Sequence, residues 1–293
     1  MSLPPWLERL RGTVAAVVAL AQAEQLTFLA AAIAYYAFVS LVPLVVLAVA
    51  IAAVVGGEAF ADDVVAIVGD TLTPASQDVL RSALTASDGR SSATVVGLAF
   101  VIWSGLKVFR ALDRGFSAVY GNGLEEGLVA QLSDAALALA AVGLAAVAAA
   151  TVVAIVGLVP LPFGQFIAPL LSLGALAFAF YPLYYLFPDV TDMDWREALP
   201  GAIFAAVAWT VMGLVFGIYA NQAAATNLYG FFGAILLLTT WLYLGALVLL
   251  VGAALNAALA GRTGHLDTEL SADVDRHLQT AGLRQDEPTE NDV

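Results

Sequence analysis

Residues 198–261 read ALPGAIFAAVAWTVMGLVFGIYANQAAATNLYGFFGAILLLTTWLYLGALVLLVGAALNAALAG and contain no Asp, Glu, Lys, Arg or His. A second uncharged run lies between Asp134 and Asp189. Because one bilayer crossing takes about 20 apolar residues, each run is long enough for two helices and a turn. A soluble protein needs ionised groups on its surface, so these runs indicate an integral membrane protein.

The composition agrees with a membrane domain. The chain is 61% hydrophobic and 12% charged over 293 residues, a length that suits a single polytopic domain. It contains no cysteine, and both histidines, His265 and His277, fall in the polar C-terminal segment. We therefore expect no disulfide, no thiolate chemistry, no histidine metal site in the membrane and no cofactor. Met1–Leu10 is polar and broken by proline, so we expect no cleavable signal peptide.

The charge balance is strongly acidic. There are 24 acidic and 11 basic residues, a net charge of −13, and Lys107 is the one lysine. Concentrated salt screens the self-repulsion of such a chain. We therefore favour a halophilic source, an archaeon in the first place, over an ordinary acidic membrane protein. An acidic surface does not attract nucleic-acid phosphates, so we expect no nucleic-acid partner.

Long apolar runs predict the fold. We expect an all-α, polytopic membrane protein with six transmembrane helices, at about 29–55, 93–112, 135–159, 163–187, 199–220 and 229–260. Backbone groups in lipid must bond internally, which requires helices here. With both termini cytoplasmic, nine of the 11 basic residues lie inside and only Arg81 and Arg90 lie outside, in agreement with the positive-inside rule. The predicted location is the cell membrane.

The spans divide the chain into three regions. Residues 1–28 form a cytoplasmic N-terminus, in which Thr13–Leu26 is expected to lie along the membrane surface as an amphipathic helix. Residues 29–261 form the membrane domain, with an acidic external loop at 56–92 that is expected to hold two short helices. Residues 262–293 form an acidic, largely disordered cytoplasmic tail.

Polar groups inside spans are the first candidates for function. Lys107, Arg110 and Arg114 fall on one stripe of the second span, where they could hold a lipid head group or an anionic solute. The alternative is a topology determinant whose side chains extend to the membrane surface.

The first span holds a second candidate group. Tyr36 and Ser40 precede Pro43, which should kink the helix and free backbone carbonyls that could line a cavity. The alternative is a structural kink that neighbouring helices satisfy. In the last span, Asn256 is a candidate ligand contact, with an interhelical hydrogen bond as the alternative.

The last two spans also carry packing motifs. Gly213 and Gly217 have the GxxxG spacing that permits close helix contact, and Gly245 with Gly252 suggests a tightly packed face. Asp194 and Glu197, just before Pro200, predict a capping box that starts the fifth span, rather than a calcium loop. Further candidates for structural motifs are Tyr229, Gly230, Gly233 and Trp241.

Several short segments resemble one family. They are AAIAYYAFVSLVPL at 31–44, RALDR at 110–114, WREALPGA at 195–202, LYGFFGA at 228–234, WLYL at 241–244 and GAALNA at 252–257. In this order and spacing they resemble the YihY/BrkB family, over about Gln22–Gly261. The resemblance implies a six-helix inner-membrane protein.

The resemblance also bears on function. Members have carried the names ribonuclease BN, widely regarded as a misassignment, and virulence or serum-resistance factor, and some are candidates for transport or lipid-related roles. Tyr185 stands where many members have a basic residue, and Ala254 where many have glutamate. A ligand that those groups bind in relatives is therefore in doubt here.

We expect a transporter or a lipid- or solute-handling protein without an ATPase of its own, in contact with membrane lipids and an anionic lipid or solute. The alternative is a structural protein that scaffolds a membrane complex through its loop or tail. A nuclease is rejected because the chain has no metal-ligand cluster and no basic groove, and we expect no enzyme activity. A cavity that opens between helices would favour the first function. The oligomeric state stays open.

Overall fold

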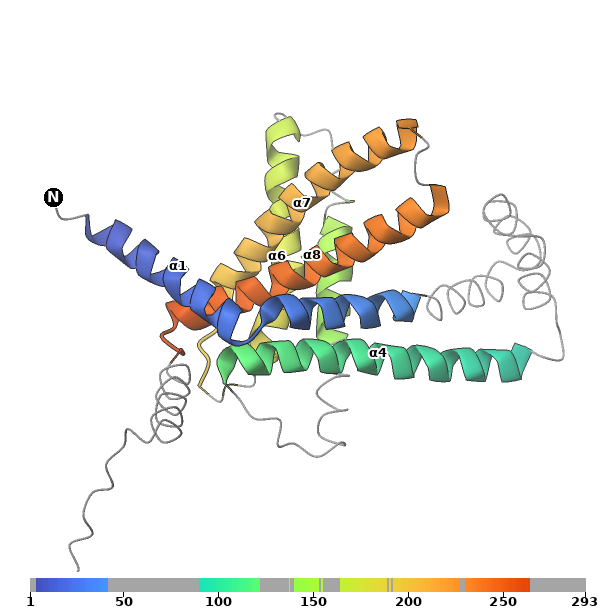
Figure 1. Cartoon of the computed structure of the whole chain (residues 1–293), viewed down its shortest axis with the longest axis horizontal. Helices are drawn as coiled ribbons and strands as arrows, with labels where there is room; N and C mark the ends of the chain where they lie inside the picture. The colour runs from blue at the N-terminus through green and yellow to red at the C-terminus, as the bar shows by residue number, and fades with distance from the viewer. Residues whose placement is uncertain are drawn as a thin grey trace, which may run out of the picture.

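The structure is a computed structural model, and it describes residues 4–41, 90–121, 137, 140–152, 154, 164–188, 190, 192–226 and 230–263. Its helices are α1 (Pro5–Ala23), α4 (Arg90–Tyr120), α6 (Gly164–Leu186), α7 (Leu199–Thr226) and α8 (Gly230–Leu259), with further helical segments at Leu26–Leu41 and Ala140–Val152. All regular structure in these residues is helical, which confirms the all-α prediction. The helix α8 packs against α1, α4 and α7, and α7 also packs against α6 (Figure 1).

The chain bends sharply between α1 and the helix Leu26–Leu41. Pro5 occupies the first position of α1, where its missing N–H removes no helical hydrogen bond. After α1 ends, Gln25 takes a left-handed conformation with φ of 49°, and the two helices meet at 63°. Leu20 and Leu26, one on each side of the bend, are fully buried. The pair has the shape expected for a surface helix that leads into a span, and its depth in the membrane stays a prediction.

The helices Leu26–Leu41 and α4 run side by side (Figure 1). They meet α8 at Gly115 of α4, where an added Cβ would lie 2.6 Å from the side chain of Leu250 and 3.6 Å from that of Ile33. The glycine therefore makes room for a three-helix contact. The helix α4 is longer than the predicted second span, 93–112, and continues to Tyr120.

The buried core lies at one end of the helices, which we call the packed end. It joins the start of Leu26–Leu41 and of α7 to the last turns of α4, α6 and α8. Phe116 of α4 lies at its centre, with ring centroids 5.7 Å from Tyr184 and 5.4 Å from Phe187. Other members include Val119, Leu183, Ala202, Ala205, Leu250, Ala253, Ala254 and Ala257.

Away from the packed end, apolar side chains of α7 and α8 are exposed. The exposed fraction is 66% for Leu214 and Ile218, and 77% for Phe232. Lipid tails are as apolar as these side chains, so this exposure is the normal condition of a helix surface in a bilayer.

Three helices have the length and composition of membrane spans. They are Pro169–Leu186, Leu199–Tyr219 and Phe232–Leu259, and the bent pair Pro5–Ala23 and Leu26–Leu41 adds a fourth if counted as one. The three match the predicted spans 163–187, 199–220 and 229–260. Charged side chains interrupt α4, and Ala140–Val152 is short, so the count of six and the side of each terminus stay predictions. Of the predicted loop 56–92, residues 56–89 lie outside the described residues, and 90–92 form the start of α4. The tail from residue 264 also lies outside the described residues.

Candidate functional site

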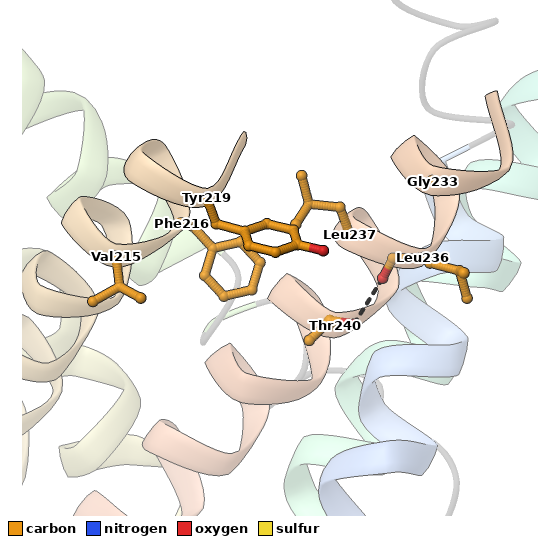
Figure 2. A pocket seen from close by; sticks show the side chains of 7 residues that line it. All are labelled: Val215, Phe216, Tyr219, Gly233, Leu236, Leu237 and Thr240. Carbon is orange, nitrogen blue, oxygen red and sulfur yellow. Dashed lines mark hydrogen bonds between the residues drawn. The ribbon is translucent and has the colours of Figure 1, made fainter. Parts of the chain in front are cut away.

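A pocket of about 510 Å³ lies between the last turns of α7 and the first turns of α8 (Figure 2). The described residues that line it are mostly apolar: Val215, Phe216, Tyr219, Gly233, Leu236, Leu237 and Thr240. The Thr240 hydroxyl donates to the Leu236 carbonyl oxygen at 2.7 Å. The Tyr219 ring reaches from α7 toward α8, and its hydroxyl points into the space between them (Figure 2).

Aromatic rings hold α7 and α8 apart next to this pocket. Phe216, which lines the pocket, packs edge-on against Trp241 with ring centroids 5.0 Å apart. Trp241 packs edge-on against Trp209 at 5.7 Å. The absence of a side chain at Gly245 leaves room for the Trp209 ring, because a Cβ at Gly245 would lie 2.8 Å from that ring. Bulky rings between the helices thus leave an opening beyond them.

At the packed end the same two helices touch through backbone. A Cβ on Gly201 of α7 would lie 2.6 Å from the carbonyl oxygen of Gly252 in α8. Asn256, 1% exposed, accepts a hydrogen bond from the Gly201 N–H at 2.6 Å and donates to the Ala198 carbonyl oxygen at 3.3 Å. It therefore caps the first turn of α7, which favours the interhelical role of Asn256 over the ligand role.

Two further contacts close the packed end. The Tyr184 hydroxyl of α6 donates to the Leu249 carbonyl oxygen of α8 at 3.0 Å. Arg262, just after α8, forms two hydrogen bonds with the Glu197 carboxylate, at 3.0 and 3.3 Å. Gly261 takes φ of 69° and the Arg262 N–H donates to the Ala257 carbonyl oxygen at 2.8 Å, a turn that aims Arg262 at the start of α7.

Tyr120, at the end of α4, lies in the field of this ion pair. Burial raises the pKa of its phenol well above the ordinary 10.0, the Glu197 charge raises it further, and the Arg262 charge lowers it. The hydrogen bond with Glu197 raises the pKa of Arg262. The phenol is therefore neutral and the arginine charged at physiological pH.

The structure brings part of the predicted cation stripe together with span one. The Lys107 ammonium lies 5.4 Å from the ring centroid of Trp103 and 6.0 Å from that of Tyr36, on the neighbouring helix. Arg110 is half-buried, and its Nε makes no hydrogen bond within the described residues. Arg114 is exposed.

The remaining candidates have simpler environments. Ser40 donates to the Ala37 carbonyl oxygen of its own helix at 2.7 Å. Pro200 is the second residue of α7, in agreement with its predicted place at the helix start. Gly230 begins α8, and Gly233 lines the pocket. Pro43 and Tyr229 lie outside the described residues.

One local prediction stays open and another is wrong. Among the described residues, a Cβ on Gly213 would meet the Trp241 ring at 3.7 Å and no atom lies within 4 Å of one on Gly217, so a close contact at these glycines stays a prediction. The capping box fails because α7 begins at Leu199 and the Glu197 carboxylate pairs with Arg262. Asp194 instead accepts a local hydrogen bond from the Arg196 N–H at 3.4 Å.

The sequence does not predict the roles of Gly201 and Tyr184 or the presence of the pocket. Gly201 lies in the WREALPGA segment, which indicates only the family resemblance. The pocket has no sequence signal, because it depends on how two helices diverge.

Several known proteins are similar to this chain. A UPF0761 membrane protein of Pseudoalteromonas translucida is 28% identical over 64% of this chain and 65% of its own length. A UPF0761 membrane protein of Ralstonia nicotianae is 36% identical over 36% of this chain and 21% of its own. The ribonuclease-like protein YfkH of Bacillus subtilis is 32% identical over 30% of this chain and 32% of its own. The matches thus span less than two thirds of these relatives, and no solved structure matches the chain.

The profile of the virulence factor BrkB family matches residues 17–276, most of the chain. That match covers the helices that build the packed end and the pocket. It also agrees with the resemblance that the short motifs indicate. The chain belongs to the virulence factor BrkB family of membrane proteins.

Proposed function

We propose that this chain handles lipids in the cell membrane, without an ATPase of its own, by taking an acyl chain into the pocket between α7 and α8. The observation that carries the proposal is the pocket itself. Its volume of about 510 Å³ falls in the range of small-molecule sites, and the described residues that line it are apolar except for Tyr219 and Thr240.

The position of the pocket favours a lipid over a water-soluble ligand. Both helices that form it are long and apolar enough to cross a bilayer. Three lining side chains, Val215, Tyr219 and Leu236, are 58%, 56% and 65% exposed. An acyl chain could therefore enter sideways from the bilayer, where apolar contact with these side chains replaces contact with other lipids.

The ribonuclease-like name of the Bacillus relative supports no second function here. RNA binding requires a cationic surface, and this chain has 24 acidic against 11 basic residues. We therefore propose no nuclease role.

Filling the pocket tests the proposal. Leu237→Trp should place an indole in the pocket and reduce the number of phospholipids that the purified protein retains, as native mass spectrometry in a neutral detergent can count. In vesicles it should also slow the exchange of a fluorescent phospholipid between leaflets. Leu214→Trp is the matched control, because Leu214 is 66% exposed on the same pair of helices and does not line the pocket.

The two variants must differ for the proposal to stand. Equal lipid retention and equal exchange in Leu237→Trp, Leu214→Trp and the parent chain would contradict it. That result would favour the scaffolding alternative, which needs no occupied pocket.

A further inference from the structure

We propose that Lys107 and Arg110 of α4, with Arg114 at the exposed end of their stripe, bind the phosphate group of an anionic membrane lipid. The inference rests on the lipid-handling function proposed above, for which it supplies the headgroup chemistry. It uses a different part of the molecule from the pocket, so the two proposals can fail separately.

The first argument is the position of the cations. Spacings of three and four residues place Lys107, Arg110 and Arg114 on one face of α4. Lys107 and Arg110 fall inside the predicted span 93–112, where an ionised side chain is costly unless it has a partner. A phosphate group beside these cations would offset that cost.

The second argument is the environment of Lys107. Among the described residues, two aromatic rings and no carboxylate lie against its ammonium group: Trp103, one turn earlier on α4, and Tyr36 on the neighbouring helix. Contact with ring faces fixes the position of the ammonium but uses no hydrogen-bond acceptor. Within the described part of the chain, no acceptor is bonded to its three N–H donors, which could bind the oxygens of a ligand.

The third argument is Arg110. Its Nε is buried and has no hydrogen-bond partner within the described residues. A buried donor without an acceptor is destabilising, and a phosphate oxygen would supply the acceptor. Arg114, one turn further and exposed, would extend the same positive surface toward the predicted cytoplasmic side.

The surroundings favour a lipid as the source of the phosphate. Tyr35 packs edge-on against Tyr36 with ring centroids 5.6 Å apart and is 62% exposed, and Trp103 is 54% exposed. Tyrosine and tryptophan with neighbouring cations are typical of the level of lipid headgroups. A free phosphate ion has no apolar part that could contact these exposed rings, so they would add nothing to its binding free energy.

The test compares phosphatidylglycerol with phosphatidylcholine of the same acyl chains, titrated into the purified full chain in a neutral detergent. Lys107→Gln with Arg110→Gln should weaken phosphatidylglycerol binding about tenfold or more and leave phosphatidylcholine binding unchanged. The matched control is Arg9→Gln with Arg11→Gln, which removes the same charge from exposed residues of α1 and should change either affinity by less than about twofold.

Arg110→Lys separates a shaped site from a topology determinant. It keeps the charge, and so the orientation, but removes the Nε donor, and it should still weaken phosphatidylglycerol binding. Inorganic phosphate distinguishes the sources: competition with phosphatidylglycerol would show that the cations also accept the free ion, and no competition would assign the site to the lipid.

Two results would overturn the proposal. One is unchanged phosphatidylglycerol affinity in the double variant, and the other is an equal loss in the Arg9 and Arg11 control. The pocket proposal fails on a different result. Leu237→Trp concerns the acyl chains and should lower the binding of both lipids together, so unchanged binding of both lipids in that variant would contradict the pocket proposal alone.

Discussion

The Asn256 amide joins α8 to the first turn of α7, where backbone N–H groups have no partner within the helix. The amide oxygen accepts from the Gly201 N–H, and the amide nitrogen donates to the Ala198 carbonyl oxygen. Local capping by Asp194 and Glu197 would have done this task from within the same segment. The chain uses a residue more than fifty positions away instead, so the start of α7 depends on α8 being in place.

Asn256→Ala should lower the free energy of unfolding by about 1–3 kcal/mol, because it leaves the buried Gly201 N–H without an acceptor. Thermal or denaturant unfolding in detergent would measure the loss. Thr239→Val is the control: its hydroxyl bonds the Ile235 carbonyl within α8 at 2.8 Å, so its removal should cost much less. An equal loss of unfolding free energy in the two variants would contradict the prediction, because the Asn256 cap would then stabilise the protein no more than a hydrogen bond within one helix.

At the scale of elements, α7 and α8 form a crossing with one tight end and one wide end. Gly201 and Gly252 allow backbone contact at the tight end, and Phe216 and Trp241 separate the helices at the wide end. Glycine is required at Gly201 because an added Cβ would meet backbone, which cannot move aside as a side chain can.

Two glycines of α7 should therefore respond in opposite ways to the same substitution. Gly201→Ala should destabilise the protein by about 1–3 kcal/mol through overpacking. Gly217→Ala should stabilise it by about 0.5–1 kcal/mol, because alanine is the better helix former and open space surrounds the position among the described residues. Unfolding of both variants in one detergent would decide whether the GxxxG spacing or the Gly201 crossing holds the helices.

The sequence predicts the local features of this fold and not the contacts between distant segments. The spans that become α6, α7 and α8 are local properties of apolar runs, and their predicted bounds agree with the structure except at the end of α7. The contact between Tyr36 and Lys107, predicted only as two separate groups, depends on which helices are neighbours. Gly201 and Gly217 look alike in sequence, and only the packing of α8 distinguishes them. The local sequence predicts a cap at Glu197, and it cannot indicate the partner Arg262, which lies 65 residues further along the chain.

At the scale of the whole molecule, three polar contacts between the described helices lie at the same end. Tyr184, Asn256 and the Arg262–Glu197 ion pair join the helices at the packed end. The pocket lies on the other side of the aromatic rings of Trp209 and Trp241. If both termini are cytoplasmic, as the charge distribution predicts, the packed end faces the cytoplasm and the pocket lies toward the outer half of the bilayer.

The absence of cysteine allows this orientation to be tested with single introduced thiols. Ser87→Cys, in the predicted external loop, should react with a membrane-impermeant maleimide on intact cells. Thr263→Cys, just after α8, should react only once the membrane is permeabilised. Labelling of Thr263→Cys on intact cells would reverse the predicted orientation, and a gel shift measures either outcome.

The close contact of Gly201 with Gly252 is the point about which α7 would pivot if it moved against α8. Tyr219 follows Gly201 by eighteen residues, so at a rise of about 1.5 Å per residue it sits roughly 27 Å along the helix. Over that length a swing of about ten degrees carries the Tyr219 ring about 5 Å. A small tilt of α7 that leaves the Asn256 hydrogen bonds intact would thus change the width of the pocket by several times more than it moves Gly201. The pocket could open or close while the contact between Gly201 and Gly252 is kept.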